Sequence, residues 1–281
     1  DDAKSIENDA NVKLNSFCLF FRKDRNLTAA DMFKRAANMY KINSKYKDFL
    51  RCMVTASKLY EENDDRHQAS VCYLDSAKVA KGIRDTTGIE YYMKYLNLTD
   101  NTRHGEIHKE IGEFYKELGK YDDAIKYLSY AIDDFDIYSR QYSINMCLDN
   151  ICRIYMNTDR FGDAGETLLK MSSKMKISSD NLLFTAMLCF IVHDPVYARQ
   201  ILDTKRHNMH NMHDDDVNFL NTCITAIMNR DGKRLNEVIS GFRFKSKVKE
   251  EHMNVIKHLK MSVVDEMVMS DDDKYEDIDL T

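Results

Sequence analysis

Three closely spaced histidines are the residues whose types most suggest chemistry. His207, His210 and His213 recur at three-residue steps and precede the aspartates 214–216, so imidazole and carboxylate groups stand together as in transition-metal sites. A helical turn takes about 3.6 residues, so each step drifts by about 60° and the outer histidines diverge. The spacing therefore favours an exposed polar turn, and a metal-binding enzyme is retained only as a third hypothesis.

The seven cysteines could supply nucleophiles, metal ligands or disulfides. Their number is odd and no C-x-x-C pair occurs, which indicates neither a disulfide framework nor a zinc knuckle. Cys147 and Cys152 stand five apart and do not share a helix face, so buried thiols in a reducing cytosol are favoured. Phosphate-binding loops, nucleophile elbows and H-E-x-x-H pairs are also missing from the sequence. We therefore predict no catalytic residue, no metal and no cofactor.

The charge balance bears on the partners. A net charge of −5 argues against bulk nucleic-acid binding, which needs a basic field. One basic run could meet phosphates or acidic protein, although the start of a solvated helix is favoured; it comprises Phe242, Arg243, Phe244, Lys245, Lys247 and Lys249. The segment 270–281 carries six acids among twelve residues. If that tail is only a solubilising sequence, its Ile278 and Leu280 are unexplained.

An apolar cluster near the N-terminus precedes several cations. Four large apolar residues occur within 17–21 and are followed by Arg22, Lys23 and Arg25. The cluster cannot lie wholly on one stripe of a short helix, so it either docks on the first hairpin or protrudes. If it protrudes, each buried aromatic contributes roughly 1.5–3 kcal/mol, which gives weak membrane attachment that needs a second anchor. No apolar run approaches the length of a bilayer span, and no signal peptide is evident.

Helical hairpins must position these groups. The chain has one proline and nine glycines, and 43% of its residues are hydrophobic. Two aromatics six residues apart flank a polar kink in three places, which begin at Tyr40, Tyr115 and Tyr155. Recurrence near 40 residues is typical of stacked hairpins that bury a continuous core together.

The pattern also predicts segment boundaries. Residues 182–192 are apolar nearly all round, which is typical of the middle of a bundle. Later helices are expected over Asp216–Asn229, Lys233–Ile239 and Lys247–Met267. We predict an N-terminal helix and apolar membrane-attachment loop over 1–26, a hairpin sheet over 27–180, a C-terminal helical bundle over 181–269 and an acidic tail over 270–281.

Four stretches carry a family resemblance. Residues 29–46, AADMFKRAANMYKINSKY, closely resemble the soluble NSF attachment proteins, the SNAP family. Further similar stretches are HQASVCYLDSAKVA at 67–80, EIGEFYKELGKYDDAIKYL at 110–128 and AMLCFIVHDPVYARQIL at 186–202. The final EDIDLT is similar to the end of the alpha class. The resemblance implies an all-α fold, a TPR-like right-handed superhelical sheet of antiparallel helical hairpins with a C-terminal helical bundle.

The resemblance also implies a function. Such proteins are adaptors, not enzymes, that hold a SNARE four-helix complex for the ATPase NSF in vesicle-mediated transport. It implies membrane contact by Phe17, Leu19, Phe20 and Phe21, SNARE binding by Lys45 and Arg103, and NSF binding by Asp194, Glu276, Asp277, Asp279 and Leu280. A protein that is monomeric when free, cytoplasmic and peripheral on the cytosolic face of membranes is expected.

This chain departs from the family on the SNARE-binding face. At three positions where the family carries lysine or arginine, this chain has Met146, Asn150 and Asp180. Loss of several contacts between exposed charges weakens steering and affinity, although each costs only up to about 1 kcal/mol. Other cations could replace them, such as Lys109, Arg140 and Arg153. A TPR-like peptide-binding scaffold of another pathway remains the main alternative.

Overall fold

The computed structural model describes residues 2–16, 22–174, 179–204 and 212–261. Within these ranges the chain forms the thirteen α-helices α1 to α13, a further helical segment at 254–261 and no strand, so the predicted all-α class is confirmed. The chain divides into two compact units, Asp1–Ser139 and Arg140–Thr281. Compactness does not test the four functional segments 1–26, 27–180, 181–269 and 270–281, which stay a prediction.

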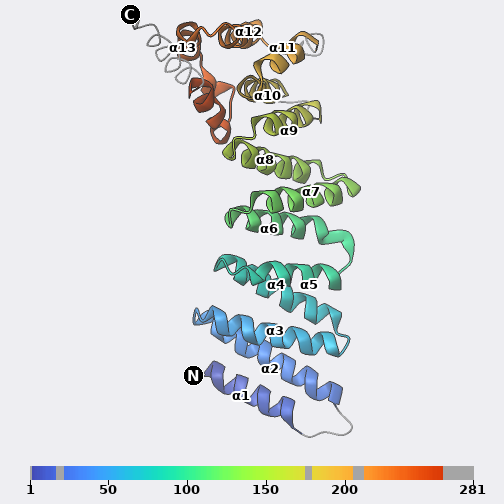
Figure 1. Ribbon diagram of the computed structural model, residues 1–281. Helices are drawn as coiled ribbons and strands as arrows, with labels where there is room; N and C mark the ends of the chain where they lie inside the picture. The colour runs from blue at the N-terminus through green and yellow to red at the C-terminus, as the bar shows by residue number, and fades with distance from the viewer. Residues whose placement is uncertain (1, 17–21, 175–178, 205–211, 262–281) are drawn as a thin grey trace, which may run out of the picture. The chain divides into compact units, whose positions relative to one another are not determined.

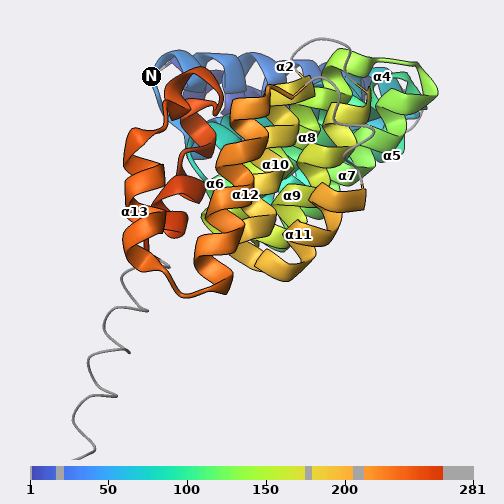
Figure 2. The ribbon, with the colours of Figure 1, turned by 90° about the horizontal axis from the view of Figure 1, so that it is seen from above.

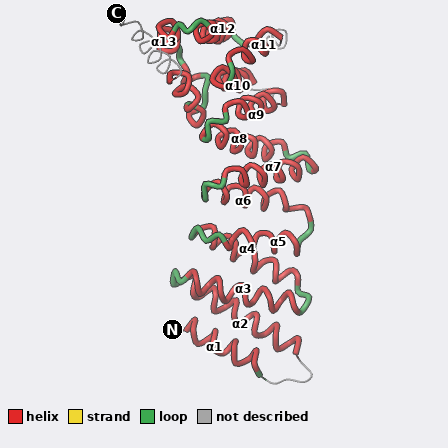
Figure 3. Tube along the Cα trace, in the orientation of Figure 1, coloured by secondary structure: helices red, strands yellow, loops and turns green. Residues whose placement is uncertain are grey.

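Unit 1 is a stack of antiparallel helices in sequence order (Figure 1). Its helices are α1 (Asp2–Asn15), α2 (Arg22–Ile42), α3 (Tyr46–Glu62), α4 (Arg66–Gly82), α5 (Thr87–Leu98), α6 (His104–Glu117) and α7 (Tyr121–Ile137), with a 3₁₀ turn at Asn101–Arg103. Because successive helices reverse direction, the joints alternate between two edges of the stack. Figure 3 shows the α2–α3, α4–α5 and α6–α7 joints at one edge and the α3–α4 and α5–α6 joints at the other.

The repeated aromatic pair marks a particular helix ending. Ser44 has a φ of 57°, and the next N–H, of Lys45, donates to the carbonyl of Tyr40 at 2.8 Å. This left-handed residue followed by a bond to the carbonyl five residues back is the Schellman motif. Gly119 has a φ of 73°, and the N–H of Lys120 donates in the same way to Tyr115 at 2.9 Å. The hairpins predicted from the aromatic spacing are confirmed at these joints.

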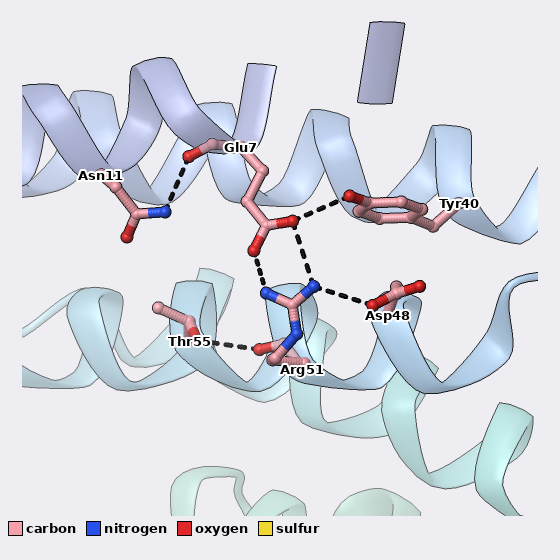
Figure 4. A network of polar contacts seen from close by, with 6 residues as sticks. All are labelled: Glu7, Asn11, Tyr40, Asp48, Arg51 and Thr55. Carbon is pink, nitrogen blue, oxygen red and sulfur yellow. Dashed lines mark hydrogen bonds and ion pairs between the residues drawn. The ribbon is translucent and has the colours of Figure 1, made fainter. Parts of the chain in front are cut away.

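Small residues let the helices of unit 1 approach closely. Ala29, Ala30, Ala36 and Ala37 of α2 are fully buried, as their spacing predicts. The first helix packs differently, since α1 buries only Ala3, Ala10 and the carboxylate-bearing Glu7. A polar network around Glu7 therefore supplements a small apolar contact (Figure 4).

Unit 2 has a central apolar helix. Its helices are α8 (Gln141–Asn157), α9 (Phe161–Lys174), α10 (Ser179–His193), α11 (Pro195–Thr204), α12 (Asp214–Met228) and α13 (Gly232–Gly241). The middle of α10 is buried at every position from 186 to 191, and α10 contacts α9, α11 and α12 (Figure 2). The bundle position predicted for residues 182–192 is thus confirmed for most of that stretch.

The predicted helix Lys247–Met267 is wrong at its start. The chain instead forms two 3₁₀ turns, Phe244–Ser246 and Glu250–His252, and residues 254–261 are helical. Side-chain bonds explain the delay, because Lys247 pairs with Asp216 at 2.7 Å and Lys249 pairs with Asp149 at 2.8 Å. These ion pairs hold the backbone in turns, and a continuous helix over the same residues would break them.

Candidate functional site

One edge of unit 1 presents cations beside exposed apolar side chains. At the α2–α3 joint Lys45 is exposed between Ile42 and Tyr46, which are 81% and 38% exposed. The α4–α5 and α6–α7 joints at the same edge repeat this composition (Figure 3). We call this surface the basic edge; it consists of Ile42, Lys45, Tyr46, Ile83, Arg84, Lys120 and Tyr121.

Helix stability alone does not select the cations of the basic edge. Lys45 and Lys120 occupy N-cap positions and make no side-chain capping bond. Asp65, at the corresponding position of another joint, accepts a hydrogen bond from the backbone N–H of Gln68 at 3.1 Å. An uncapped helix start loses about 1 kcal/mol, and the helix dipole disfavours a cation there. The lysines therefore stand where folding prefers an acid.

A local contact offsets part of that loss. The Nζ atom of Lys45 lies 6.0 Å from the ring centroid of Tyr40. In unit 2 the guanidinium of Arg160 lies 4.6 Å from the ring of Tyr155, at the same position of its joint. Such cation–π contacts contribute roughly 0.5–1 kcal/mol at exposed sites. The repeated cation thus has a packing role together with its exposed charge.

The two cations that the resemblance assigns to SNARE binding do not lie together. Lys45 belongs to the α2–α3 joint, whereas Arg103 is exposed at the α5–α6 joint on the opposite edge of unit 1 (Figure 3). Asp64 and Asp65 occupy another joint of that opposite edge. One elongated partner along a single edge would contact only one of the two cations.

Sequence reasoning missed Arg84 of the basic edge. Its joint lacks the first aromatic, because Ala80 occupies the position of Tyr40 and Tyr60. The backbone geometry is nevertheless the same: Arg84 has a φ of 57°, and the N–H of Asp85 donates to the carbonyl of Ala80 at 2.8 Å. The spacing of 20 residues from Tyr40 to Tyr60 to Ala80 was the available signal.

Two groups of predicted residues lie outside the described ranges. They are the membrane candidates Phe17, Leu19, Phe20 and Phe21, and the NSF candidates Glu276, Asp277, Asp279 and Leu280. The ends that flank the first group are tied together, since Arg25 donates to the carbonyl of Ser16 at 2.6 Å. Whether the apolar cluster docks or protrudes stays a prediction.

Asp194, the remaining NSF candidate, has a structural role. It is exposed at the start of α11 and accepts hydrogen bonds from the backbone N–H groups of Val196 and Tyr197, at 2.8 and 3.1 Å. The carboxylate therefore caps α11. Contact with a partner would have to use its remaining acceptor capacity.

Part of the basic run of unit 2 makes contacts within that unit. The buried carboxylate of Asp149 pairs with Lys249 at 2.8 Å and with Arg153 at 3.2 Å. Phe242 packs on Phe219 with ring centroids 4.1 Å apart. These contacts anchor Lys249 and Phe242 within unit 2, whereas the sequence favoured the start of a solvated helix.

Two of the three cations proposed as replacements in the SNARE grip form ion pairs, and the third, Arg140, is exposed at the start of α8. Arg153 belongs to the pair with Asp149, and Lys109 lies 3.8 Å from Glu113 on the same helix. At the substituted positions, Met146 is half-buried and Asn150 is buried, with its amide donating to the carbonyl of Met146 at 3.2 Å. Neither Met146 nor Asn150 therefore supplies a cation on this part of α8.

Within the described residues, the histidine and cysteine side chains considered for metal binding or catalysis do not come together in a site. His213 precedes α12 and is exposed, whereas His207 and His210 fall outside the described ranges. Among described residues no group of three or more His, Cys, Asp or Glu side chains could hold a metal ion. Burial raises the pKa of the Cys52 thiol to about 11 and that of Cys152 to about 12, which suppresses the nucleophilic thiolate.

Antiparallel hairpins stacked in sequence order define a helical-repeat protein. The family model described as "Soluble NSF attachment protein, SNAP" matches residues 1–264, and the chain belongs to this family. No described helix is long and apolar enough to cross a membrane.

Several relatives share this name at low identity. An alpha-soluble NSF attachment protein of Vitis vinifera is 25% identical over 57% of this chain and 56% of its own length. The alpha protein of Mus musculus is 24% identical over 61% of this chain and 62% of its own length. The beta protein of Bos taurus is 23% identical over 66% of each chain. The matched regions thus span less than two thirds of these relatives.

A solved structure is also similar over its full length. The chain titled "Crystal structure of C. therm. Get4" is 10% identical, with 100% of both chains covered and a TM-score of 0.30. That score is too low for the two folds to be equated.

Proposed function

We propose that this protein is an adaptor that binds a SNARE four-helix complex and recruits and stimulates the ATPase NSF. Family membership supports the coarse role, since the relatives are named NSF attachment proteins. The proposal includes no catalytic step in the adaptor itself, because its task is to hold two partners in one assembly. Disassembly of SNARE complexes would place it in vesicle fusion and ER–Golgi transport.

The basic edge is the observation that carries the SNARE assignment. Its joints are separated by two helices each, and helices pack 8–10 Å apart, so the cations are spread over roughly 40 Å. An elongated partner with acidic side chains can meet all three joints at once, while Ile42 and Tyr46 add apolar contact. Of the two cations assigned by resemblance, Lys45 belongs to this edge and Arg103 does not.

Two further contacts complete the proposed assembly. Phe17, Leu19, Phe20 and Phe21 would touch the cytosolic face of a membrane, so that the protein is peripheral and cytoplasmic. Asp194 and the acid-leucine end, Glu276, Asp277, Asp279 and Leu280, would engage NSF. Each contact can be weak, because contacts made by one chain raise the effective concentration of the others.

A three-part binding assay tests the proposal. The protein is mixed with a preassembled SNARE bundle and NSF, and the complex is isolated on the SNARE component while ATP hydrolysis is measured. We expect a complex that requires this chain, and stimulated hydrolysis. Deleting residues 278–281 should abolish stimulation and spare SNARE binding.

The same assay separates the main alternative. If neither SNARE binding nor a three-part complex occurs, the chain is a peptide-binding scaffold of another pathway. If the complex forms but the deletion leaves stimulation unchanged, the role of the tail is wrong while the adaptor role stands.

A further inference from the structure

Unit 2 contains a cleft at Met146, one of the positions where the family resemblance implies a SNARE-binding cation and this chain has none. It has a volume of about 630 Å³ and lies among α8, α10 and the segment 246–252. Its apolar lining is formed by Met146, Met171, Leu182 and Val248, and Tyr142 stands beside it with 80% of its surface exposed. These side chains suit one or two aliphatic groups of a ligand.

The polar part of the lining carries an excess of positive charge. Lys247, Lys249 and Arg153 line the cleft together with Asp149, and with Asp216, which binds Lys247, the surplus is one positive charge. Ion pairs fix the cations in place: Lys249 and Arg153 bind Asp149, and Lys247 binds Asp216 at 2.7 Å. A preorganised basic rim around an apolar floor fits a peptide in which carboxylates flank aliphatic side chains.

The chain itself ends in such a peptide. Residues 262–281 contain eight acids and one lysine, a net charge of −7, which leaves the preceding residues at +2. Within the last six residues Ile278 and Leu280 alternate with Asp277 and Asp279. The charge of the tail is thus opposite to that of the rest of the chain, and its end combines the two chemistries of the cleft.

We propose that the acid-leucine end of the tail, residues 276–280, binds the cleft of its own chain. The side chains of Ile278 and Leu280 enter the apolar lining beside Met146, and the neighbouring carboxylates face Lys247 and Lys249. About 15 residues separate position 261 from this end, and they can extend over roughly 50 Å. The helical residues 254–261 span only about 12 Å, so the tail is long enough to return to the adjacent segment 246–252.

Binding of the tail to the cleft of its own chain would reduce its availability to other partners. This inference rests on the proposed function in that the same residues are proposed to contact NSF. While the end occupies the cleft it is withheld from other partners, and a partner must compete with an internal ligand at an effective concentration of about 1 mM. A cleft affinity near 0.1 mM would then weaken a competing ligand by about tenfold.

Binding of the tail peptide in trans tests the proposal without NSF. A fluorescein-labelled peptide of residues 270–281 is titrated by anisotropy into the full wild-type chain and into the full chain with Ile278→Ser and Leu280→Ser. The substituted tail no longer competes, so we expect the peptide to bind that variant about tenfold more tightly than the wild type. Raising the salt concentration should weaken both interactions.

Matched substitutions locate the site. In the tail-substituted background, Met146→Asp should abolish peptide binding, whereas Met228→Asp, at a half-exposed position of α12 outside the cleft, should leave it unchanged. Tyr142→Ala changes a side chain that is 80% exposed, so it should weaken binding several-fold without affecting folding. Circular dichroism verifies the fold of each variant.

Three outcomes would overturn the proposal. If the labelled peptide bound wild type and tail variant with equal affinity, the tail would not occupy the cleft. The cleft would then be open to the peptide of a partner. Binding that survives both Met146→Asp and Tyr142→Ala would indicate general charge attraction. Undetectable binding to the tail variant would exclude the tail as ligand. None of these results would affect stimulation of NSF by the tail, which the three-part assay measures separately.

Discussion

The carboxylate of Glu7 in α1 binds the guanidinium of Arg51 in α3 through both of its oxygens, and one of these contacts measures 3.1 Å (Figure 4). The same carboxylate accepts a hydrogen bond from the hydroxyl of Tyr40 at 2.8 Å. Three successive helices therefore meet at one buried acid. Because α1 buries few apolar side chains, this network adds to the attachment that its apolar contacts provide within unit 1.

Glu7→Ala should release α1 from the stack. The substitution removes the acceptor of Tyr40, which is 4% exposed, and leaves Arg51 without its buried partner. We expect a loss of about 1–3 kcal/mol in the free energy of unfolding, at the low end because the side chain of Arg51 is half-exposed. Chemical denaturation gives the loss, and hydrogen exchange should accelerate in α1. Asp48→Ala removes only the exposed acid bound to Arg51 and should cost under about 1 kcal/mol. Equal losses would contradict a special role for Glu7.

Charge reversal on the basic edge should weaken SNARE binding. Lys45→Glu and Lys120→Glu each replace an exposed cation at an edge joint, and we expect a three- to tenfold lower affinity, about 1 kcal/mol, for each. The joints are far apart, so the double variant should show nearly additive losses. Arg103→Glu is the matched control on the opposite edge and should have a smaller effect. If Arg103→Glu costs as much as Lys45→Glu, binding does not follow a single edge.

The fold was largely predictable because its signals are local. Alanine and aromatic spacing predicted the hairpins of unit 1, and the Schellman bonds at Tyr40 and Tyr115 give the physical reason for the repeated pair. The joint at Ala80 lacks an aromatic and is not among the three predicted from the aromatic spacing, although its geometry is the same. The backbone at such joints needs one residue in the left-handed conformation. Arg84 adopts this conformation although it is not a glycine, so the sequence carries no signal for it.

The site was less predictable because it depends on contacts between distant residues. The sequence could not show that Lys249 pairs with Asp149, 100 residues earlier, so a basic run was considered as an external surface. Nor could it show that Lys45 and Arg103 emerge at opposite edges, since that depends on the number of helix reversals between them. The capping role of Asp194 is local by contrast, since it binds the N–H groups two and three residues on, and the sequence analysis did not consider it.

Gly165 should resist substitution by alanine. A Cβ atom at this position would lie 2.6 Å from the ring of Phe190, which is 1% exposed and has little room to move. We expect Gly165→Ala to lower the free energy of unfolding by about 1–3 kcal/mol. Gly82→Ala is the control, because no atom lies within 4 Å of its new methyl group and the loss of chain entropy should add up to about 1 kcal/mol of stability. Thermal unfolding of both variants checks the pair, and equal shifts would contradict the packing argument.

Buried thiols should make the protein sensitive to alkali. Burial raises the pKa of Cys72 to about 11 and that of Cys223 to about 12, whereas an unfolded thiol ionises near 8.5. The folded state therefore holds these protons more tightly. The corresponding stability is fully present below about pH 8.5 and is lost as the pH rises towards 11–12.

Cys72→Ala isolates the contribution of one thiol to this alkaline loss. Between pH 9 and 10.5 the free energy of unfolding should fall less steeply in the variant, by about 1.4 kcal/mol per pH unit. Urea denaturation over this pH range measures the slope. Ser57→Ala removes a buried group that does not titrate, so it should change stability and leave the slope as in the wild type. An unchanged slope in Cys72→Ala would show that this thiol already ionises in the folded state.

Replacing Phe20 and Phe21 by serine should lower membrane attachment. The flanking Arg22 and Lys23 lie at the start of α2, and cations there favour an anionic lipid surface beside an apolar contact. Each aromatic that enters the bilayer contributes roughly 1.5–3 kcal/mol, so co-sedimentation with anionic liposomes should fall at least tenfold. Tyr142→Ser changes an aromatic that is 80% exposed in unit 2 and should leave liposome binding unaltered. If the double serine variant instead unfolds at a markedly lower temperature, the apolar cluster belongs to the core of the first hairpin, and another surface must bind the membrane.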